Sequence, residues 1–156
     1  MKIISGGQTG VDTGALLAAE SYGMPWQAYL PQGLRRESPM PEWMRKGAIE
    51  LLGVTDYAQR TGRCIELCDA VLIIAPTLTT PGTKLTLGLA RSAAKQIWWH
   101  EPMSGVDTLS IHHWLKQQQN WLGRELVLMV AGPRESKWRG AEAMAKRVVM
   151  ANLIAL

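Results

Sequence analysis

Two hydrophobic patterns alternate along the chain. Short runs in which nearly every residue is apolar are typical of strands buried on both faces of a sheet, and stretches with apolar residues three or four positions apart are typical of amphipathic helices. The runs predict strands at residues 2–5, 26–30, 69–76, 97–100 and 125–132. The periodic stretches predict helices at residues 11–22, 57–68, 83–96, 107–121 and 140–152.

This alternation favours a doubly wound, mostly parallel α/β sheet with helices on both faces, because right-handed crossovers cover both sides of a parallel sheet. One segment interrupts it. Residues 31–56, "PQGLRRESPMPEWMRKGAIELLGVTD", contain three Pro and three Gly. We expect a long loop there with at most one helical turn, and a loop of this length inside a domain is usually functional or disordered.

Length and composition indicate one globular domain over residues 1–156, large enough for its own core. The chain is 47% hydrophobic and 19% charged, and it has no apolar run near the roughly 18 residues of a membrane span. The first residues form a strand pattern without the segments of a secretory signal. We therefore expect a cytoplasmic protein with no membrane partner.

Ligands of doubly wound sheets bind beyond the carboxyl ends of the strands, here residues 5–12, 31–37, 76–86 and 132–139. The first of these, "SGGQTG", lets the backbone approach a ligand and leads into a helix start that attracts anions. It is not a dinucleotide fingerprint, because Ser5 replaces the first glycine, and it is not a P-loop, because Val11 and Asp12 follow Gly10. A tight turn without a ligand is the alternative.

Basic residues recur in these segments, and the net charge of +4 agrees with an acidic partner without naming one. The turn "TTPGTKLT" also supplies the hydroxyls of Thr79, Thr80 and Thr83. Together the loops predict a polyanionic ligand at one edge of the sheet. The basic residues concerned are Arg35, Arg36, Lys84, Arg134, Lys137 and Arg139.

Metal-binding patterns are weak. Cys64 and Cys68 lack paired Cys or His at ligand spacing, so we expect reduced core thiols. His112 and His113 are adjacent and point about 100° apart on a helix, which indicates surface residues rather than a metal pair. We therefore predict no directly bound metal. Four tryptophans fit a core or an oligomer surface equally well: Trp98, Trp99, Trp114 and Trp121.

Six motifs carry a resemblance to a known family: "ISGGQTGVD", "LPQGLRRE", "YAQRT", "CDAVLII", "PGTKLT" and "VAGPRESK". In order and rough spacing, over residues 3–137, the chain resembles the molybdenum carrier proteins, the molybdenum-cofactor carrier family. That family belongs to the Rossmann-like SLOG superfamily of nucleotide-ligand sensors and nucleoside-monophosphate processing enzymes. The resemblance implies a Rossmann-like fold, a homo-oligomer and a groove for a phosphorylated nucleotide-like or pterin ligand, such as molybdenum cofactor (molybdopterin).

The resemblance also implies a set of ligand-binding residues. Carried onto this sequence, they are Gly6, Gly7, Gln8, Thr9, Gly10, Asp12, Gly33, Arg35, Arg60, Thr61, Gly82, Thr83, Gly132, Pro133, Arg134, Glu135 and Ser136. Two positions depart from the family pattern. Thr13 stands where a basic residue is common, and Pro81 stands where the family has the first glycine of a pair. These departures leave the identity of the ligand open.

Two other functions compete with a binding role. Related phosphoribohydrolases carry a G-G-x-G-T-x-x-E turn whose glutamate serves catalysis, and aligning Gly82-Thr83 with that turn places Thr86 at the glutamate position. Threonine cannot act as a general acid or base near neutral pH, so we expect binding without catalysis. Nucleic-acid binding would fit basic charge and tryptophan, but the Lys and Arg are scattered rather than striped along one helix.

Overall fold

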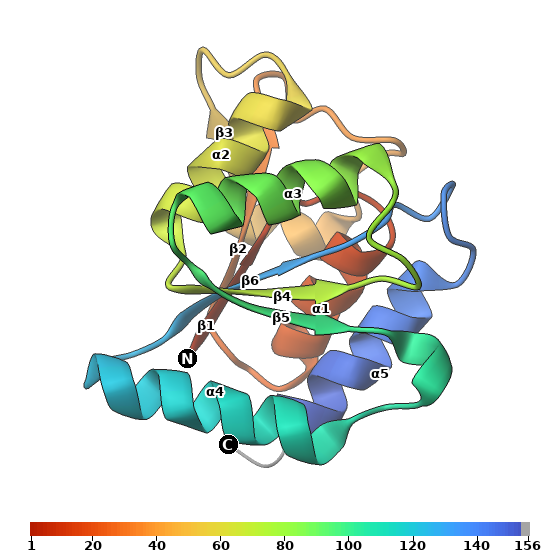
Figure 1. Ribbon diagram of the computed structural model, residues 1–156. Helices are drawn as coiled ribbons and strands as arrows, with labels where there is room; N and C mark the ends of the chain where they lie inside the picture. Colours follow the sequence, from red (N-terminus) through yellow and green to blue (C-terminus); the bar gives the residue numbers. More distant parts are fainter. Residues whose placement is uncertain (154–156) are drawn as a thin grey trace.

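Six parallel strands form one sheet in the order β3-β2-β1-β6-β4-β5 (Figure 1). The fold was obtained as a computed structural model, which describes residues 1–153 without the side chains of Ser104, Thr108 and Leu153. The strands are β1 Lys2–Ser5, β2 Trp26–Pro31, β3 Ala48–Leu51, β4 Ala70–Ile74, β5 Gln96–His100 and β6 Val127–Ala131. The predicted doubly wound α/β fold is confirmed, with a sheet that is parallel throughout.

Five helices cover the two faces of the sheet, as Figure 1 shows. On one face α2 and α3 pack over a core that includes Val71, Ile73 and Met129. The other face carries α1, α4 and α5 over the larger core. Alternate residues of β4 point to opposite cores, as expected for a strand buried on both faces. The helices are α1 Val11–Ser21, α2 Tyr57–Leu67, α3 Pro81–Ser92, α4 Thr108–Leu122 and α5 Ala141–Leu153.

The last strand in the sequence lies in the middle of the sheet, where β6 pairs with β1 on one side and with β4 on the other. From this centre the chain winds outward in two directions, through β2 to β3 and through β4 to β5. The direction of winding changes at β6, and in such sheets the loops beyond the carboxyl ends separate at that point to form a crevice. The crevice lies between the loops that follow β1, β4 and β6.

The prediction of a loop over residues 31–56 is wrong in part. The segment contains a 3-10 helix, η1 Glu42–Gly47, and the sixth strand, β3. None of the four residues of β3 is fully buried, and the strand pairs only with β2 at the edge of the sheet. Its short "AIEL" pattern is therefore too weak to predict a strand, and pairing with β2 determines its structure.

Helix α3 also differs from the prediction, which placed a helix at residues 83–96. It begins at Pro81, a residue that suits the first turn because its missing N–H would have no helical partner there. It ends at Ser92, and Ala94 adopts a positive φ of 52° before β5 begins at Gln96. The earlier start matters because it brings Pro81 and Gly82 into the first turn of the helix.

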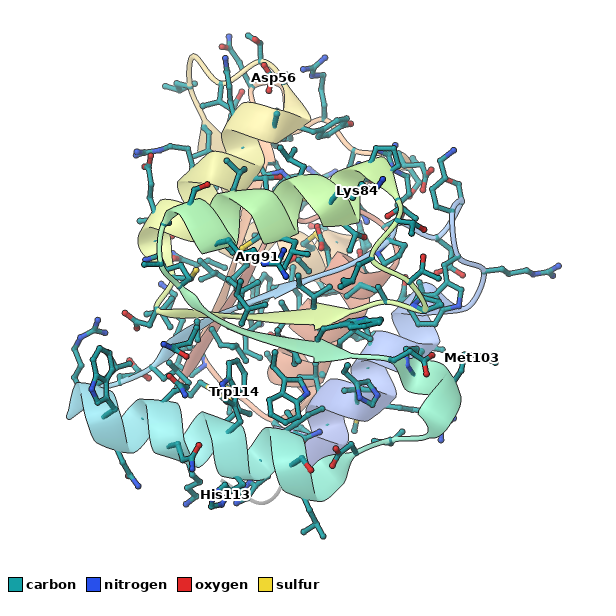
Figure 2. All side chains as sticks on the ribbon, viewed as in Figure 1. Asp56, Lys84, Arg91, Met103, His113 and Trp114 are labelled. Carbon is teal, nitrogen blue, oxygen red and sulfur yellow. The ribbon has the colours of Figure 1, made fainter. Side chains whose placement is uncertain are left out.

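The structure shows which of the cysteine, histidine and tryptophan side chains are buried. Cys64 and Cys68 are free and buried, as predicted. His113 is exposed and lies on the side of α4 opposite Trp114, which points toward the sheet (Figure 2). Among the tryptophans, Trp114 is buried in the core, whereas Trp121 is 80% exposed. Within the described helices, none is long and apolar enough to cross a membrane.

Candidate functional site

A cavity of about 270 Å³ opens at the carboxyl edge of the sheet. The loop after β1 contributes Gln8, the first turn of α1 contributes Asp12, and the first turns of α2 and α3 contribute two further walls. Met129 and Ala131 of β6 are among the apolar lining residues, and the loop after β6 adds Arg134. The cavity therefore lies at the change of winding direction, where a doubly wound sheet is expected to bind its ligand.

A buried ion pair forms part of the cavity wall. Arg60 Nη1 lies 3.4 Å from Asp12 Oδ2, and both side chains are about nine-tenths buried. The backbone amide of Gln8 donates to the same carboxylate oxygen at 3.1 Å. Burial raises the pKa of Asp12 above its usual range, and the Arg60 charge and the Gln8 amide oppose this shift. A carboxylate with such a perturbed pKa in a cavity is typical of a functional site.

The first glycine of the "SGGQTG" loop makes room for this ion pair. A Cβ atom on Gly6 would lie 0.8 Å from Arg60 Nη1, so only glycine allows the guanidinium to lie across the backbone. Gly10 has a φ of 76°, and its Cβ would lie 2.5 Å from the carbonyl oxygen of Pro133. These two glycines therefore allow close approach by the protein's own groups.

Several amides of the first glycine loop and of the first turn of α1 donate hydrogen bonds within the protein. Thr9 N donates to Gln8 Oε1 at 3.0 Å, and Val11 N donates to the Pro133 carbonyl at 3.2 Å. Thr13 N donates to the Gln8 carbonyl at 3.2 Å. Since the Asp12 carboxylate also lies at this helix start, a phosphate would meet a like charge here. The start of α1 is therefore a poor phosphate site in this structure.

The start of α3 is open in contrast. Its N-cap residue, Thr80, makes no side-chain capping bond. Among the described residues, no hydrogen bond is found to the backbone amides of Gly82 and Thr83, and both residues line the cavity. A Cβ atom on Gly82 would meet nothing within 4 Å. Figure 2 shows Lys84 at this same end of α3. The first turn of α3 thus offers free donors to an anion.

Cationic side chains complete this part of the cavity. Arg134 and Lys137 line it from the loop after β6, and within residues 1–153 neither forms a salt bridge. The Arg134 guanidinium carbon lies 5.6 Å from the centre of the Tyr57 ring, and that of Arg60 lies 5.7 Å from it. Contact with the ring positions Arg134 while leaving its N–H groups available.

Two other acids in the loops beside the cavity have structural roles. Glu37 accepts hydrogen bonds from the hydroxyls of Thr9 and Ser136, and so ties three loops together. These bonds lower the pKa of Glu37, the Ser136 bond most. Glu135 accepts hydrogen bonds from the amides of Gly140 and Glu142, at 2.5 and 3.0 Å, at the start of α5. In the described structure, Asp12 is therefore the only acidic side chain that lines the cavity.

The structure brings together about half of the residues carried over from the family. Those that line the cavity are Gln8, Asp12, Arg60, Thr61, Gly82, Thr83, Gly132, Pro133 and Arg134. Outside its lining lie Gly6, Gly7, Thr9, Gly10, Gly33, Arg35, Glu135 and Ser136. Gly6, Gly10, Thr9, Glu135 and Ser136 position cavity residues or hold the loops, as described above. A direct role in ligand binding stays a prediction for every member of the set.

The predicted set lacked eight lining residues, namely Tyr57, Thr80, Pro81, Leu85, Thr86, Met129, Ala131 and Lys137. Thr80 and Lys137 are absent from the set implied by the family resemblance, but the sequence already indicated them as a hydroxyl and a basic residue in segments that follow strands. Met129 and Ala131 are alternate residues of β6 that face α2 and α3, as strand periodicity could have indicated. Tyr57 opens α2 in the motif "YAQRT", from which the resemblance carried over only Arg60 and Thr61.

Comparison with known proteins agrees with this geometry. The model of the circularly permutated YpsA SLOG family matches residues 3–153. The chain belongs to this family. Within the SLOG fold, a similar solved structure is that of the putative molybdenum carrier protein from Syntrophus aciditrophicus, with a TM-score of 0.79 and 29% sequence identity. The match covers 97% of this chain and 94% of that protein. No curated protein matches the chain.

Membership of the circularly permutated YpsA SLOG family confirms the resemblance found in the sequence. The six motifs that carried it lie in the matched range, and four of them contribute lining residues to the cavity: "ISGGQTGVD", "YAQRT", "PGTKLT" and "VAGPRESK". The motif "LPQGLRRE" acts through Glu37 at the loop junction, and "CDAVLII" supplies β4.

Proposed function

We propose that this chain is a binding or carrier protein for a small phosphate-bearing ligand with a flat ring system, nucleotide-like or pterin. The observation that carries the proposal is the open start of α3, whose unbonded amides face the same cavity as Arg134 and Lys137. Anions bind at such helix starts, and arginine adds bidentate contacts to a phosphate. We place the phosphate there rather than at the first glycine loop.

The rest of the cavity suits a ring. Met129, Ala131 and Leu85 give it apolar surface, and Tyr57 adds an aromatic side chain. Molybdenum cofactor, a pterin with a phosphate, is one ligand of this description, and the Syntrophus protein is named a molybdenum carrier. Within the described lining there is no Cys or His side chain, so the protein would hold this cargo by its phosphate and pterin rather than by its metal.

A homo-oligomer in the cytoplasm is the expected setting. Two buried, free thiols agree with a reducing compartment. Exposed Trp121 and Leu109 on α4 offer apolar surface to another copy of the chain.

Replacing Arg134 by lysine tests the phosphate contact. Lysine keeps the charge but loses the planar fork, so Arg134→Lys is expected to weaken nucleoside 5′-monophosphate binding by roughly 1 to 3 kcal/mol. Arg139→Lys is the matched control, because Arg139 lies in the same loop, is exposed and does not line the cavity. Calorimetric titration of both variants measures the difference. Equal affinity in Arg134→Lys and wild type would make Arg134 a surface residue.

An enzyme acting on a nucleoside monophosphate is the second candidate, because Asp12 is a carboxylate in the cavity. Against it, Thr86 lines the cavity where related phosphoribohydrolases carry their glutamate, and its hydroxyl donates to the Gly82 carbonyl at 3.0 Å. Asp12 is already paired with Arg60. We expect no free base above the buffer control when the protein is incubated with nucleoside 5′-monophosphates. Base release that disappears in Asp12→Asn would establish the enzyme instead.

A nucleic-acid strand is a poorer occupant than a small molecule. The cavity is small, and the cations around it come from separate loops rather than from one stripe along a helix. Binding of single-stranded oligonucleotides more tightly than of mononucleotides would favour this third candidate.

A further inference from the structure

Two hydrogen bonds hold the Asp12 carboxylate through one of its oxygen atoms. Oδ2 accepts from the Gln8 amide at 3.1 Å and from Arg60 Nη1 at 3.4 Å. The buried Ser5 side chain also acts on this carboxylate and lowers its pKa, and Oδ1 is not among the side-chain oxygens buried without a partner. Since Asp12 lines the cavity, its carboxylate can also accept a hydrogen bond from a ligand there.

A carboxylate in a cavity for anionic ligands restricts how the ligand lies. A phosphate beside Asp12 would be repelled, so the phosphate belongs with Gly82, Arg134 and Lys137. Asp12 follows β1 and Gly82 follows β4, and β6 lies between these two strands. Two inter-strand spacings separate β1 from β4 by about 10 Å. One ligand can therefore present its phosphate at α3 and its ring at Asp12.

The carboxylate of Asp12 favours a ligand ring with hydrogen-bond donors on the edge that faces it. An ionised carboxylate only accepts hydrogen bonds, so its best partner has adjacent N–H donors. Guanine and pterin share a 2-amino-4-oxopyrimidine ring, which places a ring N–H beside an amino group. Hypoxanthine keeps the ring N–H but lacks the amino group. Adenine presents a ring nitrogen acceptor beside its amino group, and that acceptor repels the carboxylate.

We propose that Asp12 is the specificity-determining residue of the cavity, and that it selects phosphorylated ligands with a 2-amino-4-oxopyrimidine ring. This inference rests on the proposed function of the same site. It gives one chemical reason why a guanine nucleotide and a pterin suit the same cavity. Arg60 acts as a positioning residue, because its contact with Oδ2 holds the carboxylate in place at the cavity.

Calorimetric titration with three nucleotides tests the inference. Wild type is expected to bind guanosine 5′-monophosphate roughly tenfold more tightly than inosine 5′-monophosphate, and to bind adenosine 5′-monophosphate more weakly still. Asp12→Asn keeps the shape of the side chain but replaces one acceptor by a donor. The preference for guanine over hypoxanthine is expected to disappear in this variant. Because the preference is a ratio within one protein sample, partial unfolding of the variant does not change it.

The outcomes separate this inference from the proposed function. Equal affinities of wild type for the three nucleotides would overturn the selection by Asp12 and leave a phosphate-binding cavity in place. A guanine preference that persists in Asp12→Asn would also overturn it, because another group would then read the ring. Failure of wild type to bind any of the three nucleotides, or a pterin phosphate, would overturn both proposals together.

Discussion

At the residue scale, two glycines after the first strand make room for other groups of the protein itself. Gly6 leaves space for the Arg60 guanidinium, and Gly10 leaves space for the loop after β6. The sequence motif indicated close approach to the backbone correctly. It could not show that Arg60 is the group that approaches, because Arg60 lies far along the chain and only the packing of α2 beside β1 brings the two together.

Gly6→Ala is expected to destabilise the protein, because its methyl group would occupy the position of Arg60 Nη1 and separate the buried Asp12–Arg60 pair. Breaking a buried pair costs about 3 kcal/mol. Gly62→Ala is the control, since a Cβ atom there meets nothing within 4 Å and alanine favours the helix. Urea unfolding measures both variants. A Gly6→Ala protein as stable as wild type would contradict the described position of Arg60.

At the element scale, strongly patterned segments were predictable and weakly patterned ones were not. The apolar run of β4 predicts a central strand, and the structure buries all five of its residues. Strand β3 has four residues at the sheet edge, and its formation depends on pairing with β2. The start of α3 was placed two residues late, although Pro81 is a first-turn signal. Because of that small error, the predicted helix did not include Pro81 and Gly82 in its first turn.

The amino edge of the sheet is held by a bidentate pair without a role in the site. Arg124 donates to both Asp69 oxygens at 3.0 and 2.5 Å, and the Val127 amide donates to one of them at 2.9 Å. Burial raises the pKa of Asp69, but the bonds from Arg124 and Val127 outweigh it and hold the pKa below the usual 3.8. This pair links the starts of β4 and β6 at the edge opposite the cavity.

Asp69→Asn is expected to lower the free energy of unfolding by about 1 kcal/mol at neutral pH, a modest value because Arg124 is more than half exposed. A carboxyl group whose pKa is lower in the folded than in the unfolded protein stabilises the fold at pH values above its unfolded-state pKa. This stabilisation is lost as the pH falls through the folded-state pKa. The difference between variant and wild type should therefore shrink below about pH 4. Denaturant titrations at pH 7 and pH 3 check this. A difference that stays constant across that range would show that the carboxylate charge contributes nothing.

At the scale of the whole molecule, the order of strands determines where the site forms. Because β6 returns to the centre of the sheet, its loop carries Arg134 and Lys137 to the cavity between the loops of β1 and β4. The sequence predicted that the loops after the strands share one edge, which is correct. It could not predict which helix start stays open, since the use of the α1 amides depends on contacts between distant loops.

The central claim is that a phosphate binds at the open start of α3. Gly82→Val tests it directly, because Gly82 lines the cavity and a Cβ atom there meets nothing within 4 Å, so the new side chain displaces no neighbouring atom. Gly88→Val is the matched control in the same helix, where a Cβ atom also meets nothing within 4 Å but the residue does not line the cavity. The measurement is calorimetric titration of both variants with guanosine 5′-monophosphate. We expect Gly82→Val to lose affinity at least tenfold and Gly88→Val to bind like wild type. Wild-type affinity in Gly82→Val would contradict it.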